Sequence, residues 1–327
     1  RGMGGNLRSF SAYLRAPVAI EQRVEQPPQI FSGVTPPSPE AQADDLLALI
    51  NFCKGGLKTV SGLLAGLVQG MGLIILNAPR TLDQRLTFIQ GLLTLLPAPA
   101  RAAITFATNV IDPAQTNPQI KFMNQSVPLD RHLTFDWATG KLLQEAPDDP
   151  YTKFIMAQLR LDTSVVIEAT EKLARTAVWR AMRRETMANA LAWASKRASL
   201  DSAVREGLPA DRSLVASVLA EDPTLPDDMR VMYAKHLVRL SLVLNNPAST
   251  EMIPAMAVQN HELADAVYEQ LWSASGGDKA AAVYHMAETW ITKAPMGVDV
   301  TRWRPLLGMA ALSRVNALLP GDPAKLV

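Results

Sequence analysis

The strongest chemical feature of this sequence is a group of cations between Lys172 and Arg197. Seven cations lie in this stretch beside a single acid, Glu185, so it carries a net charge of +6 in a chain of net charge +1. Clustered positive charge indicates a binding surface for polyanions in a way that total charge does not. Two tryptophans in the same stretch, Trp179 and Trp193, offer flat surfaces for base stacking or cation–π contact.

The pattern predicts a surface that follows a phosphate backbone. If the stretch is one continuous helix, most of its cations project within an arc of about 140°. Arginine outnumbers lysine five to two, which suits the fork-shaped contacts of guanidinium with phosphate. Without a base-reading motif, binding is expected to be non-specific. The predicted nucleic-acid-binding residues are Lys172, Arg175, Trp179, Arg180, Arg183, Arg184, Lys196 and Arg197, with Arg131 in addition.

Two other interpretations of the cations remain open. Charged residues on a helix often form a solvated face, or pair with acids elsewhere in the fold. An acidic protein partner is the other alternative. Seven alanines in the stretch, beginning at Ala174 and ending at Ala194, indicate close helix packing on the opposite side. A helix that is packed on one side and cationic on the other fits all of these interpretations.

The sequence contains none of the common catalytic signatures. There is no P-loop, no glycine-rich dinucleotide fingerprint, no nucleophile elbow and no HExxH zinc motif. The four histidines are not spaced as a di-metal carboxylate site requires. We therefore expect no enzymatic activity, no metal and no cofactor.

The elements that position the basic stretch are predicted to be helices. Helical periodicity begins near Glu40, and prolines divide it into segments such as Leu57–Asn77 and Pro99–Ile111. Residues 112–130 form a long polar connection, and a long helical region covers 151–206. Asp148 and Asp149 are placed to cap its start. Strand signals are almost absent, so the expected fold class is all-α, with irregular helices in two lobes.

The predicted domains are an extended arm over residues 1–42, an N-terminal helical lobe over 43–222 and a C-terminal helical lobe over 223–327. The arm holds six prolines and scattered apolar anchors such as Phe10 and Phe31, so we expect it to dock on a neighbouring subunit. The implied partner is therefore a second copy of the chain.

The cysteine content and the hydropathy of the chain indicate its expected compartment and whether it enters a membrane. The single cysteine, Cys53, lies in an apolar stretch and is expected to be a buried core residue. Residues 62–78 are apolar but only of marginal length for a bilayer span, so we expect a buried helix and no membrane insertion, and a membrane-inserting hairpin formed with residues 88–107 is the alternative. No secretory signal opens the chain, and the expected location is intracellular, cytoplasmic or within a virion.

Together these features predict a self-assembling RNA-packaging protein of the viral nucleoprotein type, which holds single-stranded RNA non-specifically in a basic groove. The alternative is a helical capsid, scaffold or secretion-apparatus assembly protein that binds no nucleic acid.

Overall fold

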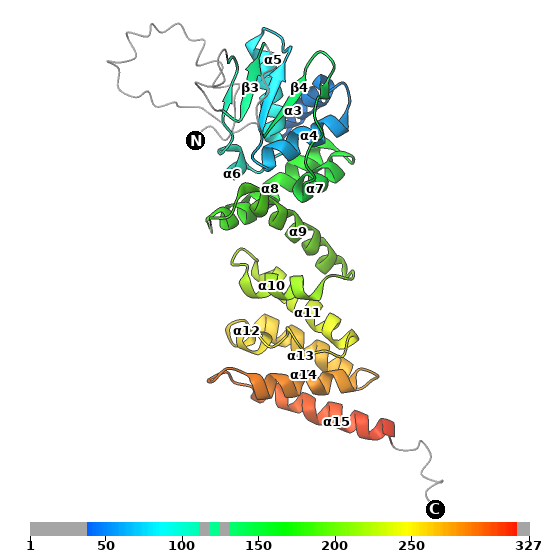
Figure 1. Cartoon of the computed structure of the whole chain (residues 1–327). Helices are drawn as coiled ribbons and strands as arrows, with labels where there is room; N and C mark the ends of the chain where they lie inside the picture. The colour runs from blue at the N-terminus through cyan, green and yellow to red at the C-terminus, as the bar shows by residue number, and fades with distance from the viewer. Residues whose placement is uncertain (1–37, 111–117, 125–130, 183, 319–327) are drawn as a thin grey trace, which may run out of the picture. The chain divides into compact units, whose positions relative to one another are not determined.

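The computed structural model describes residues 38–110, 118–124, 131–182 and 184–318 (Figure 1). The chain divides into two compact units, Arg1–Lys196 and Arg197–Val327. The sequence places the boundary between the helical lobes later, after residue 222. Residues 1–37 of the expected arm lie outside the described residues, and the last four residues of that range belong to the first described helix, α3.

The first unit contains helices and a small sheet, and the second unit is helical. The elements of the first unit are α3 (Pro39–Phe52), α4 (Leu57–Val68), β1 (Gly72–Leu76), α5 (Leu82–Thr94), α6 (Ala98–Arg101), β2 (Phe106–Ala107), β3 (Ile120–Met123), β4 (His132–Asp136), β5 (Lys141–Leu142), α7 (Pro150–Leu159) and α8 (Thr163–Met182). Helix α9 (Met187–Glu206) follows. The second unit continues with α10 (Arg212–Glu221), α11 (Asp227–Val243), α12 (Ile253–Gln259), α13 (His261–Ser275), α14 (Ala280–Lys293), a 3-10 turn (Thr301–Trp303) and α15 (Arg304–Leu318).

The protein is mostly helical, as predicted, but the expected near-absence of strands is wrong. Five strands form one sheet in the order β2-β3-β1-β4-β5. The pairs β1–β3, β1–β4 and β2–β3 are parallel, whereas β5 runs antiparallel to its neighbour β4. Helix α4 packs on the sheet against β1, β4 and β5. The first unit is therefore an α/β structure and not a helical lobe.

Strand β1 lies where the sequence predicts the end of a long helix. The helix α4 ends at Val68, and Gly70 then adopts a φ of +70°, which ends the helical geometry. Residues 73–76 are buried, because a central parallel strand is covered on both faces and reads as an unbroken apolar run. Periodicity cannot distinguish such a run from a buried helix. A Cβ at Gly72 would lie 2.2 Å from the His132 ring, so a larger residue there would force the ring to move.

Two further predictions, one of a helix and one of a polar connection, are wrong because strands lie in these segments. The predicted helix Pro99–Ile111 is a single turn, α6, followed by β2. Strand β3 lies inside the predicted polar connection 112–130, and its four residues are all buried. The predicted cap before α7 is confirmed, because a side-chain oxygen of Asp149 accepts a hydrogen bond from the backbone N–H of Thr152 at 2.7 Å.

The core of the first unit contains a group of aromatic rings. Phe88 of α5 is fully buried. Its ring centroid lies 5.3 Å from that of Phe135 on β4 and 5.0 Å from that of Trp137. Phe52 of α3 completes the group, 4.6 Å from Trp137. These contacts hold α3 and α5 against the sheet.

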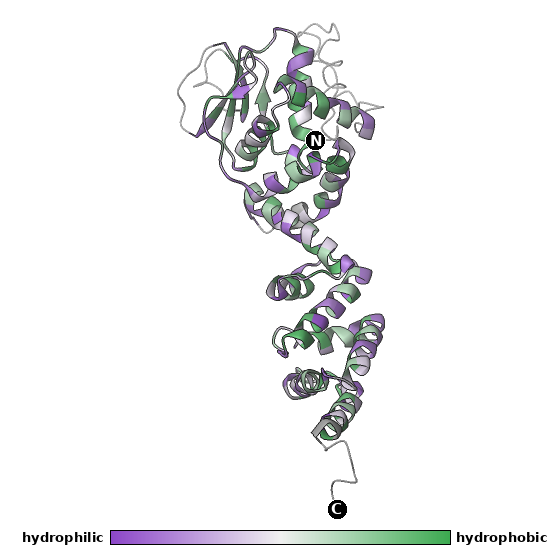
Figure 2. Ribbon diagram, turned by 90° about the vertical axis from the view of Figure 1, so that its right-hand side faces the viewer, coloured by the Kyte–Doolittle hydropathy of each residue, from purple (hydrophilic) through white to green (hydrophobic). Residues whose placement is uncertain are grey.

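The second unit is a stack of paired helices. Helix α10 packs on α11, α12 on α13, and α14 on α15, while α13 contacts the pairs on both sides of it. Figure 2 shows hydrophobic and hydrophilic residues alternating along these helices, as expected for helices with one buried face. Trp290 and Trp303 form part of the core, with ring centroids 4.9 Å apart. The Trp290 indole N–H donates to Thr250 Oγ1 at 2.9 Å.

The predicted buried helix over 62–78 is divided between α4 and β1. Among the described residues, no helix has both the length and the apolar character that a membrane span requires.

Candidate functional site

The predicted basic stretch does not form one continuous helix. Helix α8 ends at Met182 and α9 begins at Met187. In the turn between them Arg184 has a φ of 63°, and the Thr186 hydroxyl accepts a hydrogen bond from the Asn189 N–H at 3.3 Å. The single 140° arc expected for the cations therefore does not exist. Thr186 was the sequence signal for this break, because threonine is a good N-cap residue.

Acids inside and beyond the stretch pair with several of its cations. Lys172 Nζ lies 2.6 Å from a carboxylate oxygen of Glu168, in an exposed pair one helical turn apart. Arg180 pairs with Glu185 at 2.8 Å. Counting charges only from 172 to 197 hides Glu168 and two aspartates that pair with Arg197. The local excess of positive charge is therefore smaller than the sequence window indicates.

Arg180 packs inside the turn between α8 and α9. Its side chain is only 15% exposed, and its guanidinium carbon lies 4.1 Å from the centroid of the Trp193 ring. A guanidinium over an indole face is an attractive cation–π contact. Arg180 and Trp193 thus join the end of α8 to the start of α9, an arrangement that leaves little of Arg180 for a phosphate.

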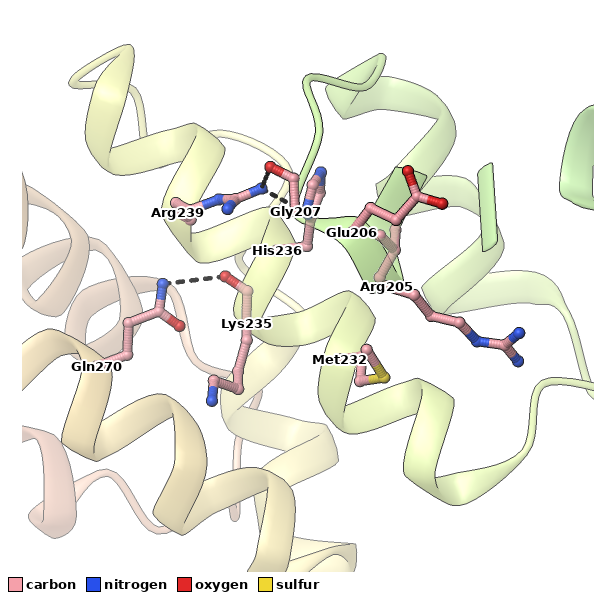
Figure 3. Close-up of a pocket in the computed structure, with 9 residues that line it drawn as sticks. Arg205, Glu206, Gly207, Met232, Lys235, His236, Arg239 and Gln270 are labelled. Atoms are coloured by element: carbon pink, nitrogen blue, oxygen red, sulfur yellow. Dashed lines mark hydrogen bonds between the residues drawn. The ribbon is translucent and has the colours of Figure 1, made fainter. Parts of the chain in front are cut away.

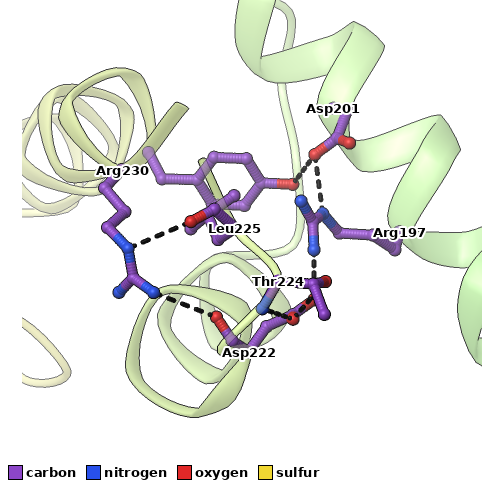
Figure 4. Close-up of polar contacts among 7 residues, drawn as sticks. Arg197, Asp201, Asp222, Thr224, Leu225 and Arg230 are labelled. Carbon is purple, nitrogen blue, oxygen red and sulfur yellow. Dashed lines mark hydrogen bonds and ion pairs between the residues drawn. The ribbon is translucent and has the colours of Figure 1, made fainter. Parts of the chain in front are cut away.

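Arg197 belongs to a buried network of ion pairs and hydrogen bonds (Figure 4). Its side chain is 6% exposed, its Nε donates to Asp201 at 2.8 Å, and its Nη1 donates to Asp222. The Asp222 side chain is fully buried and also accepts hydrogen bonds from the backbone N–H and the hydroxyl of Thr224. The Tyr233 hydroxyl donates to Asp201 at 2.6 Å.

The charge state of this network follows from its contacts. Burial opposes the charge on Arg197, but the two carboxylates outweigh it and hold its pKa above the ordinary value. Burial and the neighbouring Asp201 carboxylate raise the pKa of Tyr233 well above its usual range. Both groups therefore keep their protons at neutral pH. Arg197 stabilises the second unit through these contacts. This structural role explains the presence of the arginine without any contact to nucleic acid.

Besides the paired Lys172, four of the predicted site residues are exposed on the described surface. Arg175 lies on α8, Arg184 in the turn and Lys196 on α9, while Arg131 directly precedes β4. None of these four has an ion-pair partner within the described part of the chain. The side chain of Trp179 and the whole of Arg183 lie outside the described residues.

A pocket that the sequence did not reveal lies in the second unit (Figure 3). It has a volume of about 300 Å³ and lies between the end of α9, the middle of α11 and α13. Its lining includes Lys235, His236 and Arg239 of α11 and Gln270 of α13. Arg205 also contributes, but its guanidinium points away from the α11 cations (Figure 3). Its residues lie far apart along the chain, between 204 and 270, so no local sequence pattern marks the pocket.

His236 is held in one protonation state by Arg239. The Arg239 Nη2 atom lies 2.9 Å from His236 Nδ1 and donates at 2.6 Å to the backbone oxygen of Gly207. A guanidinium can only donate, so Nδ1 accepts and the neutral ring carries its proton on Nε2. Burial, together with the positive charge of Arg239, lowers the pKa of His236. The ring is therefore neutral near pH 7.

Two buried polar atoms of the pocket have no hydrogen-bond partner among the described residues, His236 Nε2 and Gln270 Oε1. The Gln270 amide nitrogen already donates to the Lys235 backbone oxygen at 3.1 Å, so exchanging the amide atoms would not satisfy Oε1. An unsatisfied buried donor or acceptor costs about 1–3 kcal/mol. Such groups call for an explanation, for which an ordered water, an ion or a ligand is a candidate.

The lowered pKa of His236 predicts a dependence of stability on pH. The unfolded ring gains a proton below a pH of about 6.5, whereas the folded ring gains it only at lower pH, so the free energy of unfolding falls as the pH decreases below that value. His236→Gln should flatten this dependence between pH 7.5 and 5.5 in urea titrations. The exposed control His261→Gln should leave it unchanged. An equal slope in wild type and His236→Gln would contradict the prediction.

Cys53 is a core residue, as predicted, and is 2% exposed. Burial raises the pKa of its thiol to about 12. The thiol stays protonated at neutral pH and is a poor nucleophile. Within the described residues there is also no group of histidine, cysteine or acidic side chains that could hold a metal ion.

Comparisons with protein-family models, with curated proteins and with solved structures find no match to this chain.

Proposed function

We propose that this protein is a non-enzymatic assembly protein that associates with further copies of itself. The observation that carries the proposal is an exposed apolar stripe on α15. Met309, Leu312 and Val315 are 38%, 61% and 53% exposed, and their spacing of three residues places them along one side of the helix. A solvent-facing side of a helix ordinarily carries polar residues. An apolar one favours association.

Charge complementarity favours a second copy as the partner. The first unit contains 20 lysines and arginines against 16 acids, and the second unit contains 12 against 15. The two units therefore carry net charges of +4 and −3. Opposite charges steer the second unit of one copy toward the first unit of another. Head-to-tail contacts of this kind produce rings or open chains.

Placing a charge in the apolar stripe tests this function. Light scattering at increasing concentration should give the wild type a mass above the 35.5 kDa of one chain. Leu312→Glu should weaken the association by about 10-fold or more, because burying an unpaired carboxylate is costly. Arg304→Glu, an exposed substitution on the same helix, is the control. A wild type that stays monomeric at 100 µM, or equal association of both variants, would overturn the proposal.

RNA packaging is the second candidate function, and it is favoured by the exposed cations Arg175, Arg184 and Lys196. If these three contact phosphates, the affinity for single-stranded RNA should fall by about 20-fold between 50 and 200 mM salt. Changing all three to glutamate should abolish the binding in fluorescence anisotropy, whereas Lys153→Glu on α7 should leave it unchanged. Affinity that survives the triple change would exclude this surface. The ultraviolet absorbance ratio of protein purified without nuclease separates the two candidates.

A further inference from the structure

The pocket in the second unit combines groups that call for an anion. Lys235 and Arg239 are four residues apart on α11, so they lie on the same side of the helix. Neither has an ion-pair partner among the described residues, and Glu206 is the only acid in the lining. Like charges one helical turn apart repel each other. The second unit has a net charge of −3, yet these two cations lie together at a pocket. A negative group that binds between them would explain this arrangement.

The two unsatisfied atoms specify what else the ligand must carry. His236 Nε2–H is a donor, since Arg239 occupies the acceptor Nδ1, and it therefore favours an acceptor oxygen. Gln270 Oε1 is an acceptor whose amide nitrogen is already used. Figure 3 shows the Gln270 amide at the backbone oxygen of Lys235, with the His236 ring next to Gly207. The complementary ligand has a carboxylate together with an N–H donor close to it.

We propose that this pocket binds the C-terminal residue of a peptide. The terminal carboxylate lies against Lys235, Arg239 and the His236 Nε2–H, and the amide N–H of the terminal residue donates to Gln270 Oε1. A volume of about 300 Å³ is at the lower end for ligand pockets and suits one terminal residue. Capture of a terminal carboxylate is a known mode of peptide recognition. The inference is independent of self-assembly.

A phosphate group fits the same residues less well. Phosphate sites typically use backbone N–H groups at the start of a helix, whereas this pocket is lined by the end of α9 and the interior of α11. The Arg239 guanidinium is turned toward Gly207 and His236, which leaves it unable to form a two-pronged contact through Nη2. Both unsatisfied atoms are covered in the described conformation, so the side chains around them must move when a ligand enters.

N-acetylglycine is the smallest probe with both required groups, a carboxylate and an adjacent N–H. The chain has four histidines, so its imidazole NMR signals are few, and His236→Gln identifies the one that belongs to His236. We expect N-acetylglycine to shift the His236 signals with a millimolar Kd. N-acetylglycinamide, which has no carboxylate, should bind at least 10-fold more weakly. Acetate, which has no N–H, should fall between the two.

Variants test the individual contacts. Lys235→Ala, at an exposed position, should raise the Kd for N-acetylglycine at least 10-fold, whereas Lys196→Ala should not change it. Gln270→Leu should remove the preference for N-acetylglycine over acetate. The proposal is overturned if the His236 signals do not respond, if N-acetylglycinamide binds equally well, or if inorganic phosphate binds more tightly than N-acetylglycine.

Light scattering on the same samples keeps this test separate from the proposed assembly function. Leu312→Glu should bind N-acetylglycine like the wild type, because α15 does not line the pocket. If a protein fails to assemble but still binds N-acetylglycine, the proposed assembly function is affected and the peptide pocket is not. If it assembles but does not bind N-acetylglycine, only the peptide pocket is refuted.

Discussion

Replacing Arg197 with alanine should lower the free energy of unfolding of the second unit by about 3–5 kcal/mol, because removing one partner from a buried ion pair leaves the other charge buried without compensation. Here the substitution removes the ion-pair partner of two carboxylates at once, Asp201 and the fully buried Asp222. Asp222 also accepts hydrogen bonds from Thr224, so it is fixed in place and cannot turn toward solvent.

Urea denaturation followed by circular dichroism measures this loss, with separate fits if the two units unfold in separate transitions. Lys196→Ala is the matched control, since it removes the neighbouring exposed cation and should change stability by less than about 0.5 kcal/mol. A loss below about 1 kcal/mol for Arg197→Ala would mean that the network is open to water and that Arg197 is available for other contacts.

Replacing Phe88 with alanine should destabilise the first unit by about 3–5 kcal/mol, the range for removing a buried aromatic side chain from a well-packed core. Phe88 is fully buried, and its ring contacts those of Phe122, Phe135 and Trp137.

The same urea titration reports this effect, with Leu47→Ala as the control. Leu47 is 49% exposed on α3 and should contribute much less. If Phe88→Ala changes the free energy of unfolding no more than Leu47→Ala does, the aromatic group is not the core of this unit.

The helices of the second unit could largely be predicted from the sequence. The sequence predicts that the range 223–327 is helical, and it contains the helices α11 to α15. Local signals suffice there, because prolines, glycines and capping residues end each helix where its amphipathic pattern ends. Asn260 illustrates this, since its side chain accepts from the Leu263 N–H at the start of α13.

The sheet could not be predicted, because what makes it a sheet is pairing between distant segments. Ile74 of β1 pairs with Lys121 on one side and Thr134 on the other, and nothing in the sequence around Ile74 specifies those partners. An apolar run flanked by a helix reads as more helix until its neighbours are known.

The candidate site could not be predicted from the sequence for a related reason. The cations of the basic stretch are visible in sequence, but Asp222, which takes up Arg197, lies 25 residues away. Charge counted in a window is therefore a poor guide to charge at a surface. The pocket illustrates the converse, since His236 and Gln270 become neighbours only when α11 packs on α13.

Gly207 has a consequence for how this protein can change in evolution. It follows α9 with a φ of +69°, and a Cβ there would lie 2.8 Å from Arg239 Nη1. Any other residue would both strain the backbone and displace the guanidinium that fixes the His236 tautomer. In homologous sequences, Gly207, His236 and Arg239 should therefore be retained together or lost together. A lineage that keeps all three retains the pocket, and one that has lost the glycine has abandoned it.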